Sequence, residues 1–247
     1  MAASVAMRRL AVGAFTMLCY VALAQENSHT GTMSLNSIVD ALEKTQATVH
    51  AHVSYQIVRE YRLSGSKDSR ADSEVVAEVD FRPPASKDYR IQHSSGGNRG
   101  LQVVKRVLDQ EVASSSNPSR TALSRDNYNF SYVGEATQDG KLCYLLGLRP
   151  KRKAAELISG QVWIDEHSFV VRHIEGELAK TPSWWLRKVS VKLTFADVEG
   201  TWLQTGMQAT ADVRIVGPHT LTSHILDYRT ANEVAWAGTG IRAARKP

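Results

Sequence analysis

An alternation of apolar and polar residues dominates this chain between residues 53 and 228. Ten segments are strand-like, and most carry apolar residues at every second position, the spacing of a β-strand with one buried face. Their ranges are 53–63, 75–81, 89–93, 128–132, 142–148, 162–165, 169–175, 189–195, 207–215 and 221–228. Short turn sequences such as Asp139-Gly140 and Glu199-Gly200 separate most of them. Consecutive strands with short connections pair antiparallel, so the pattern predicts a mainly antiparallel sheet of about ten strands.

Two segments have the helical period instead. In the first, which Ser34 or Ser37 can cap, one face carries Leu35, Ile38, Val39, Leu42 and Val49. The second is predicted over 100–113, and a Ser-rich loop over 114–125 is expected to be the least ordered internal stretch. A long antiparallel meander with one apolar face must curl and cover that face. The two helices are available as the cover.

The N-terminal residues have the pattern of an export signal. Arg8 and Arg9 precede a short apolar run over 10–23. Ala22 and Ala24 are small residues at the two positions that a signal peptidase recognises. The alternative is a retained membrane anchor, but spanning a bilayer takes about 20 apolar residues. We therefore expect cleavage after Ala24 and a product outside the cytoplasm.

The rest of the chain shows no break in composition and no repeat of solenoid length, so we expect one domain. The predicted divisions are a signal peptide (1–24), a loose N-terminal segment (25–33), the sheet domain (34–230) and a basic C-terminal tail (231–247).

Composition narrows the class of protein further. Apolar residues make up 43% of the 247 residues and charged residues 22%, which excludes a disordered chain. The formal net charge of +5 is too mild and too scattered to indicate nucleic-acid binding. Two cysteines exclude a disulfide scaffold. Cleavage would remove Cys19 and leave Cys143, which lies in a strongly apolar strand and reads as a buried small hydrophobe.

Signatures of catalysis are absent from the sequence. It contains no Gly-x-Ser-x-Gly, no phosphate-binding glycine loop and no His-Glu-x-x-His. His50 and His52 have a spacing that metal ligands use, but no third ligand is evident, and a solvated helix end is the favoured interpretation. Asp165 and Glu166 are adjacent at a turn, which favours a hairpin end over an acid–base pair. We expect a non-enzymatic protein without metal or cofactor.

The first predicted strand carries the candidate lid and cavity residues. Its alternation places on one face, expected to point into the curled sheet, the residues Tyr55, Ile57, Arg59, Tyr61 and Leu63. A guanidinium there is costly unless its donors are satisfied. The alternative is a register one residue out, because Glu60 and Arg62 make the other face polar too, and such a slip would turn Arg59 outward.

A second candidate is the pair Trp184-Trp185, which follows Pro182 in a loop before a strand. Aromatic residues at such a position contact lipid or a partner, so the pair is a candidate docking edge or mouth. The alternative, in which one ring caps the core and the other lies on the surface, is equally open.

These features together resemble a known family. The chain resembles the outer-membrane lipoprotein-sorting (LolA-like) proteins in its export signal, its N-terminal helix and its long strand series with one inserted helix. Three segments add to the likeness: 58–61 (Val-Arg-Glu-Tyr), 160–165 (Gly-Gln-Val-Trp-Ile-Asp) and 198–203 (Val-Glu-Gly-Thr-Trp-Leu). The resemblance implies a half-open antiparallel β-barrel covered by helices. It also implies a periplasmic carrier that holds lipid or lipoprotein acyl chains in an apolar cavity, with Arg59 tying the helical lid closed.

Other readings stay open beside the carrier. One branch of the family senses envelope stress through a regulatory partner, so the alternative is a scaffold or regulatory module with a filled barrel that acts through a protein partner. A secreted hydrolase with a dispersed site is the third, and the absent motifs count against it. We expect a monomer whose partners are acyl chains and an envelope membrane protein, not nucleic acid.

Overall fold

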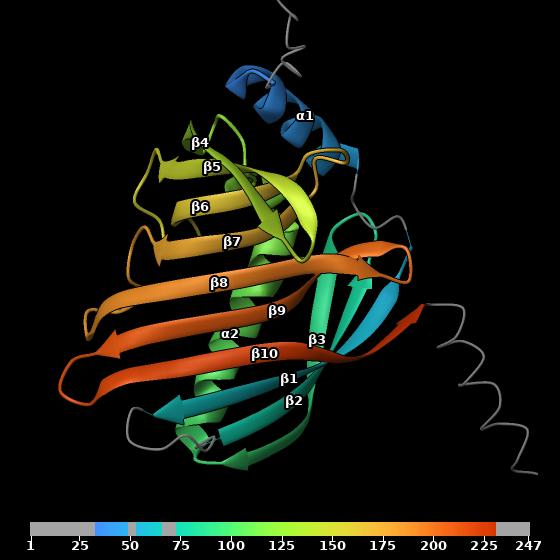
Figure 1. Ribbon diagram of the computed structural model, residues 1–247. Coiled ribbons are helices and arrows are strands. Elements are labelled where there is room, and N and C mark those ends of the chain that lie inside the picture. Colours follow the sequence, from blue (N-terminus) through green and yellow to red (C-terminus); the bar gives the residue numbers. More distant parts are fainter. Residues whose placement is uncertain (1–32, 49–52, 66–72, 231–247) are drawn as a thin grey trace, which may run out of the picture. The chain divides into compact units, whose positions relative to one another are not determined.

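The computed structural model describes residues 33–48, 53–65 and 73–230. Contacts divide the chain into Met1–Thr32 and Met33–Pro247, and every described element belongs to the second unit (Figure 1). Its helices are α1 (Leu35–Thr48), α2 (Asn98–Ser116) and a 3-10 turn, η1 (Pro118–Arg120). Its strands are β1 (Tyr55–Gly65), β2 (Ser73–Arg82), β3 (Ser86–Gly96), β4 (Tyr128–Gln138), β5 (Lys141–Pro150), β6 (Ile158–Asp165), β7 (Val171–Leu178), β8 (Leu186–Val198), β9 (Thr201–Val213) and β10 (Gly217–Thr230).

All ten strands form one antiparallel sheet in the order β3-β2-β1-β10-β9-β8-β7-β6-β5-β4. Every neighbour pair is consecutive along the chain except β1 and β10, which join the first three strands to the other seven. The sheet does not close, because β3 and β4 remain its two edges. The prediction of a half-open antiparallel barrel of about ten strands with helices on it is therefore confirmed.

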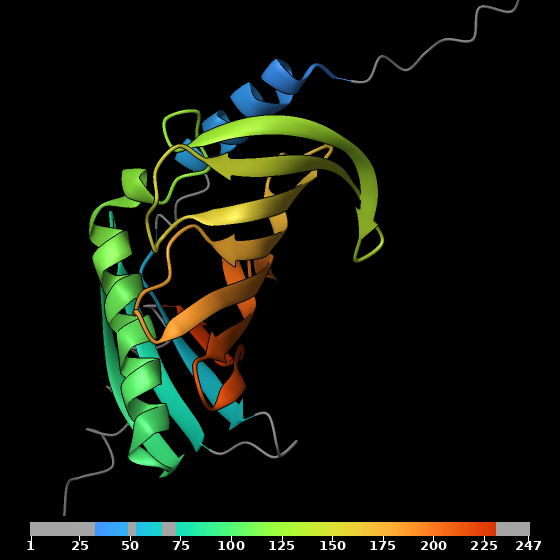
Figure 2. The same cartoon turned by 90° about the vertical axis from the view of Figure 1, so that its left-hand side faces the viewer.

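Strong curvature gives the sheet a concave face, and β1 to β3 wrap around α2 (Figure 2). Two apolar clusters fill the ends of this face. In the first, Ile38, Val39 and Leu42 of α1 are buried against side chains of β4 to β7. In the second, Val104 and Leu108 of α2 are buried against β1, β2 and β10. Each helix thus covers one end of the concave face.

The helix boundaries differ slightly from those expected. Ser34, not Ser37, caps α1, since its hydroxyl accepts the Ser37 N–H at 3.1 Å. The prediction of a loop from residue 114 is wrong, because α2 continues to Ser116. The hydroxyls of Ser115 and Ser116 both donate to the Val112 carbonyl, which satisfies an acceptor near the helix end. None of the helices in the described ranges is both long and apolar enough to cross a membrane.

On the convex face, β1 and β2 bury two carboxylates. Glu60 is 6% exposed beside Arg62 and His224, and Glu78 is 6% exposed beside Arg90. β1 is therefore polar on its convex face, as the sequence suggested, while its concave face is the more apolar one. The side chains of Tyr55, Ile57, Arg59 and Tyr61 lie on the concave face and are buried, and Leu63 is half-buried there.

Candidate functional site

A nearly continuous apolar row crosses the concave face from β5 to β2. Successive strands place directly opposite one another the residues Leu146, Val162, Ile174, Leu193, Met207, Ser223, Tyr61 and Val75. Ser223 is the one polar member. The row is buried at both ends, where Leu146 and Val162 are 0% exposed and Tyr61 and Val75 are 1% exposed.

The middle of this row is less completely covered than its ends. Leu193 and Met207 are half-buried, and so is Phe195, two residues along β8. Among the helices, α2 contacts mainly β2 and β3, and α1 contacts mainly β4, so the helices lie chiefly over the outer strands of the sheet. We call Leu193, Phe195 and Met207 the central concave face. These three side chains are a part of the apolar surface that is only half-buried.

Arg59 links this region to α2. Its guanidinium is 6% exposed and donates to Glu111 of α2, with Nη1 2.9 Å from Oε2. Its Nη2 donates to the Gln204 carbonyl of β9 at 3.3 Å. Gln204 lies directly opposite Phe195 in the sheet, so the guanidinium reaches from α2 to the rim of the central concave face.

Glu111 receives a second cation from the edge strand. Lys87 of β3 donates from Nζ to Oε1 at 2.7 Å, so each oxygen of the carboxylate is paired. Burial opposes ionisation of this carboxyl, but Arg59 and Lys87 outweigh it and lower the pKa of Glu111 to about 2. The cluster Arg59–Glu111–Lys87 is therefore a charged tie between α2 and two strands, β1 and β3. We call it the α2 tie.

Aromatic residues pack on β1 beyond the tie. Tyr55 stacks on Phe81 at 4.9 Å between ring centroids and on Tyr228 at 5.8 Å, and burial raises the pKa of Tyr55. The Tyr228 hydroxyl in turn lies 2.9 Å from the Thr201 hydroxyl. The contacts of Arg59 have the geometry expected of a residue that ties a helix to the sheet. That Tyr55, Ile57, Arg59, Tyr61 and Leu63 form a lid and cavity stays a prediction.

Sequence reasoning did not identify Glu111 or Lys87 as partners of Arg59. Glu111 stands three residues after Leu108 and seven after Val104, so it occupies the apolar face of α2. A charged residue at such a position was the available signal. The identity of its partners depends on tertiary packing and could not be read from the helical period.

The tryptophan pair divides between core and surface. Trp185 packs against a third apolar cluster with Leu186, Val189 and Val213, whereas the Trp184 side chain is 84% exposed. The interpretation in which one ring caps the core and the other is on the surface therefore describes the burial. A docking role for Trp184 is compatible with its exposure and stays a prediction.

The adjacent acids Asp165 and Glu166 lie at the β6–β7 turn, as expected of a hairpin end. Asp165 Oδ1 accepts the backbone N–H groups of His167 and Ser168 at 3.1 and 3.0 Å, and Oδ2 accepts Arg172 Nε at 2.7 Å. Although burial opposes ionisation, these donors hold the pKa of Asp165 well below its usual range. This carboxylate organises a turn.

No group of three or more metal-ligating side chains occurs within the described ranges. His50 and His52 lie outside those ranges. Cys143 is a free thiol with 0% exposure, and burial raises its pKa, so its predicted character as a buried hydrophobe is confirmed.

Two shallow depressions occur away from the central concave face. One, of about 270 Å³, lies on the convex side between β7, β8 and β9 and is lined mostly by polar residues, among them Glu175, Lys192 and Gln208. The other, of about 370 Å³, lies beside the β4–β5 turn and is lined by residues such as Lys141 and His167. None of the apolar side chains of the row across the concave face lines either depression.

Comparisons with known proteins give a family match over part of the chain. Residues 119–230 match a family described as a family of unknown function (DUF5686). A search of curated protein sequences found no match.

Solved structures give distant likenesses over most of the chain. A domain from Vibrio parahaemolyticus assigned to outer membrane lipoprotein sorting is 13% identical, with a TM-score of 0.44, covering 78% of this chain and 92% of that one. A LolA superfamily protein from Nitrosomonas europaea is 12% identical, with a TM-score of 0.39 and coverage of 80% and 94%. The Pseudomonas aeruginosa MucA/MucB complex gives 12% identity, a TM-score of 0.28 and coverage of 78% and 99%. At TM-scores below 0.5, these likenesses carry no functional assignment to this chain.

Proposed function

We propose that this chain is a non-enzymatic carrier of the periplasm that holds lipid or lipoprotein acyl chains on its central concave face. The observation that carries the proposal is the apolar row across the sheet, whose middle members Leu193 and Met207 are half-buried while its ends are fully buried. Each acyl methylene moved from water onto such a surface contributes about 0.8 kcal/mol. A chain of several methylenes would therefore bind without any catalytic group.

Helix α2 serves as a movable cover in this proposal. The α2 tie holds the helix against β1 and β3 through charged contacts, in addition to the apolar packing of Val104 and Leu108. Charged contacts of this kind depend on geometry, so a small shift of the helix would weaken them together. Arg59 contacts both α2 and β9, and its β9 partner Gln204 lies opposite Phe195. A ligand bound at Phe195 could therefore change the contacts that hold α2 in place.

The periplasmic location rests on the predicted signal peptide, which lies outside the described residues. The same prediction makes a lipid or an envelope lipoprotein the natural source of acyl chains.

A fluorescent fatty-acyl probe tests the carrier directly. Wild-type protein should bind the probe at micromolar concentration, and unlabelled lipid should displace it. Met207→Glu places a carboxylate on the central concave face and should weaken binding by at least about tenfold, because a buried charge without a partner is costly. Gln208→Glu is the matched control, since the next residue of β9 is exposed on the convex side. Equal binding by the two variants would refute the proposed site.

The second candidate is a regulatory or scaffold module with a filled barrel that acts through a protein partner. The observation in its favour is that the apolar row of the concave face lines neither of the two depressions described above. Absence of probe binding by wild-type protein, together with an unchanged fold, would favour this function over the carrier.

A further inference from the structure

Two connections lie side by side where β7 and β9 end. This edge is formed by the ends of strands and is distinct from the two edge strands, β3 and β4. The three-residue turn 214–216 joins β9 to β10, and the loop 179–185 joins β7 to β8. The Arg214 N–H donates to the Trp185 carbonyl at 3.0 Å, and Arg214 Nε donates to the Trp184 carbonyl at 3.0 Å. The two connections are therefore one surface.

The tip of this surface is apolar and exposed. Trp184 is 84% exposed, Val216 is 55% exposed, and Ile215 is fully exposed at 102%. Ile215 also has a φ of 80°, in the left-handed region where turns ordinarily place Gly or Asn. Neither packing nor turn geometry requires an apolar, β-branched residue at that position. We call Trp184, Ile215 and Val216 the apolar tip.

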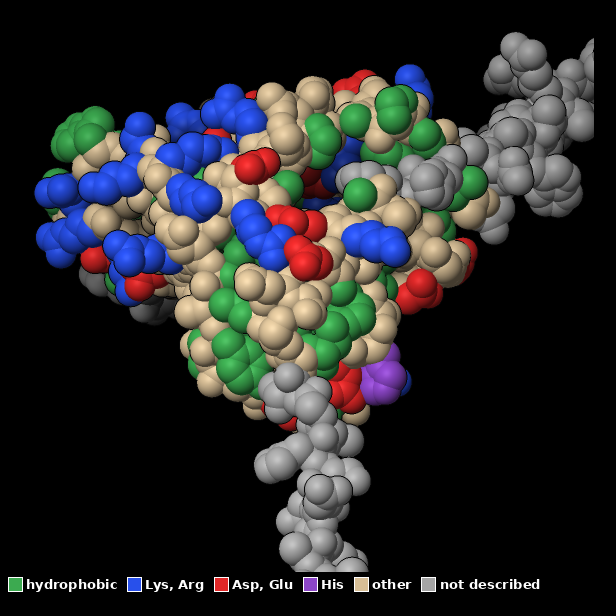
Figure 3. Space-filling view, turned by 90° about the horizontal axis from the view of Figure 1, so that it is seen from above, with side chains coloured by type: hydrophobic (Ala, Val, Ile, Leu, Met, Phe, Trp, Pro, Cys, Tyr) green, Lys and Arg blue, Asp and Glu red, His purple; other side chains and the backbone are tan. Residues whose placement is uncertain are grey.

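Basic side chains gather beside the apolar tip. The connections at this edge, over residues 149–157, 177–188 and 212–218, contain eight exposed lysines and arginines and three carboxylates. The basic collar comprises Arg149, Lys151, Arg152, Lys153, Lys180, Arg187, Lys188 and Arg214. Figure 3 shows apolar side chains protruding at the left end of the view, with Lys and Arg gathered beside them. The carboxylates Glu156, Glu177 and Asp212 each pair with a member of the collar, which leaves a positive excess.

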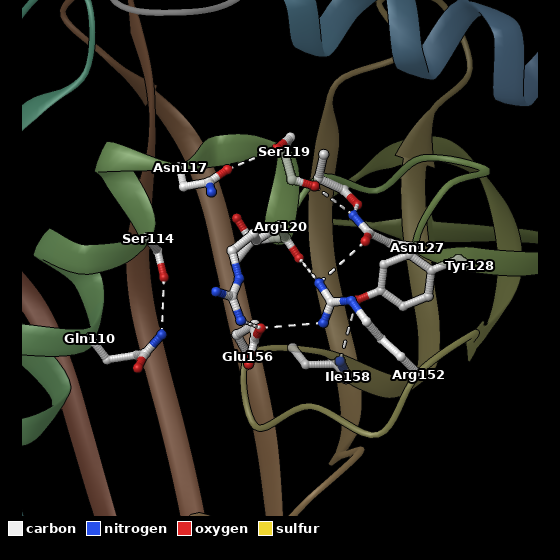
Figure 4. A network of polar contacts seen from close by, with 12 residues as sticks. Gln110, Ser114, Asn117, Ser119, Arg120, Asn127, Tyr128, Arg152, Glu156 and Ile158 are labelled. Atoms are coloured by element: carbon white, nitrogen blue, oxygen red, sulfur yellow. Dashed lines mark hydrogen bonds and ion pairs between the residues drawn. The ribbon is translucent and has the colours of Figure 1, made fainter.

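One collar residue, Arg152, is held by contacts with the neighbouring connections. Figure 4 shows Arg152 held by the Glu156 carboxylate at 3.2 Å and by the Arg120 carbonyl at 2.6 Å. The Ala179 N–H donates to the Leu157 carbonyl at 2.8 Å, which joins the loop after β5 to the loop after β7. Behind the tip, Trp185 is anchored in the third apolar cluster. Contacts within the described residues therefore hold Arg152 of the collar and the residue that adjoins the tip, Trp185.

We propose that this edge docks onto an anionic lipid bilayer, with the apolar tip inserted at the headgroup level and the basic collar against the headgroups. Tryptophan favours the membrane interface because its ring is apolar and its N–H is polar. Lysines and arginines near an anionic surface each strengthen binding by about fivefold. The charge complementarity favours a lipid surface over an apolar protein groove. This inference goes beyond the acyl-chain site and does not depend on it, since the tip lies on a different surface.

Vesicle co-sedimentation tests the proposal with the exported chain, its N-terminus checked by intact mass. Wild-type protein should bind vesicles of phosphatidylcholine with phosphatidylglycerol, bind pure phosphatidylcholine vesicles weakly, and lose binding as salt is raised. Combined Trp184→Ala, Ile215→Ser and Val216→Ser should weaken binding by at least about tenfold. The control Val133→Ser with Leu142→Ser removes two exposed apolar residues from β4 and β5 and should bind as wild type does.

A quenching experiment locates the tip in the bilayer. Brominated lipids should quench the tryptophan fluorescence of bound wild-type protein, and Trp184→Phe, which keeps the tip apolar, should lose most of that quenching while still binding. Binding by the triple variant at wild-type strength, or no binding of wild-type protein to anionic vesicles, would overturn the proposal. Tip-dependent binding to envelope membranes but not to protein-free vesicles would overturn it in favour of a protein partner.

Discussion

Removing the charge of Glu111 should destabilise the protein in a way that depends on pH. A pKa held at about 2, against an ordinary 4.5, corresponds to about 3 kcal/mol of stabilisation of the folded state by the ionised carboxylate. This is an upper figure, because the side chain is 23% exposed and solvent screens the pair. This figure already includes the loss of the ion pair between Glu111 and Arg59, because Arg59 is one of the two cations that lower the pKa. We expect a loss of about 3 kcal/mol in unfolding free energy at pH 7.

The direction of the pH effect follows from the lowered pKa. The stabilisation is fully present above the pKa of the unfolded carboxyl and is lost as pH falls from about 4.5 towards 2. The difference between wild type and Glu111→Gln should therefore shrink at pH 3 to about half its value at pH 7. Urea unfolding at the two pH values measures it, with circular dichroism as the readout.

A control variant and a double-mutant cycle make this test specific. Asp109→Asn removes an exposed carboxylate of α2, bonded to the Tyr89 hydroxyl at 2.7 Å, and should cost less than about 1 kcal/mol. Arg59→Leu combined with Glu111→Gln should cost less than the sum of the two single changes by at least about 1 kcal/mol. A difference between wild type and Glu111→Gln that is the same at pH 3 and pH 7 would refute the assignment of a charged tie.

Further predictions concern other parts of the chain. Intact mass of the exported protein should match a chain that begins at Gln25, and a retained leader would contradict this. Arg59→Leu should alter uptake or release rates of an acyl probe while leaving the circular dichroism spectrum unchanged; wild-type rates would show that it has no lid role. Asp165→Ala should lower the unfolding free energy at pH 7 by at least about 2 kcal/mol, because it removes the acceptor for a turn and for a cation. Trp184→Ala should leave the melting temperature unchanged and Trp185→Ala should lower it, and the reverse order would contradict their burial.

The strands were predictable from the sequence because their apolar period of two is strong and their turns are short. The pattern 189–195, for example, falls within β8, and the turn at Glu199-Gly200 separates β8 from β9. The face of β1 was also readable, since Tyr55 and Tyr61 flank Arg59 at even spacing. Boundaries were less readable. Helix α2 extends to Ser116, where serine hydroxyls bond to a backbone carbonyl in a sequence that otherwise looks like a loop.

The candidate sites depended on contacts that no local pattern specifies. Glu111 meets Arg59 only because α2 lies in the curve of β1 to β3. Trp184 and Ile215 stand 31 positions apart and become one surface only because β8 pairs with β9 in the observed register. Sequence reasoning could mark each residue as unusual for its position, but the partner in each case comes from the topology.

The pairing of β1 with β10 also sets the order in which the molecule can be completed. Tyr55 lies opposite Thr230, so β1 cannot complete its pairing until β10, the last strand of the sheet, has been synthesised. Contacts of such long sequence separation form late, because a long loop must be closed before they contribute. Until β10 is in place, β1 to β3 with α2 and the meander β4 to β9 are two separate sheets with four exposed edges instead of two. A truncation that removes β10 would therefore leave one sheet of β1 to β3 and another of β4 to β9, each open to pairing with other chains.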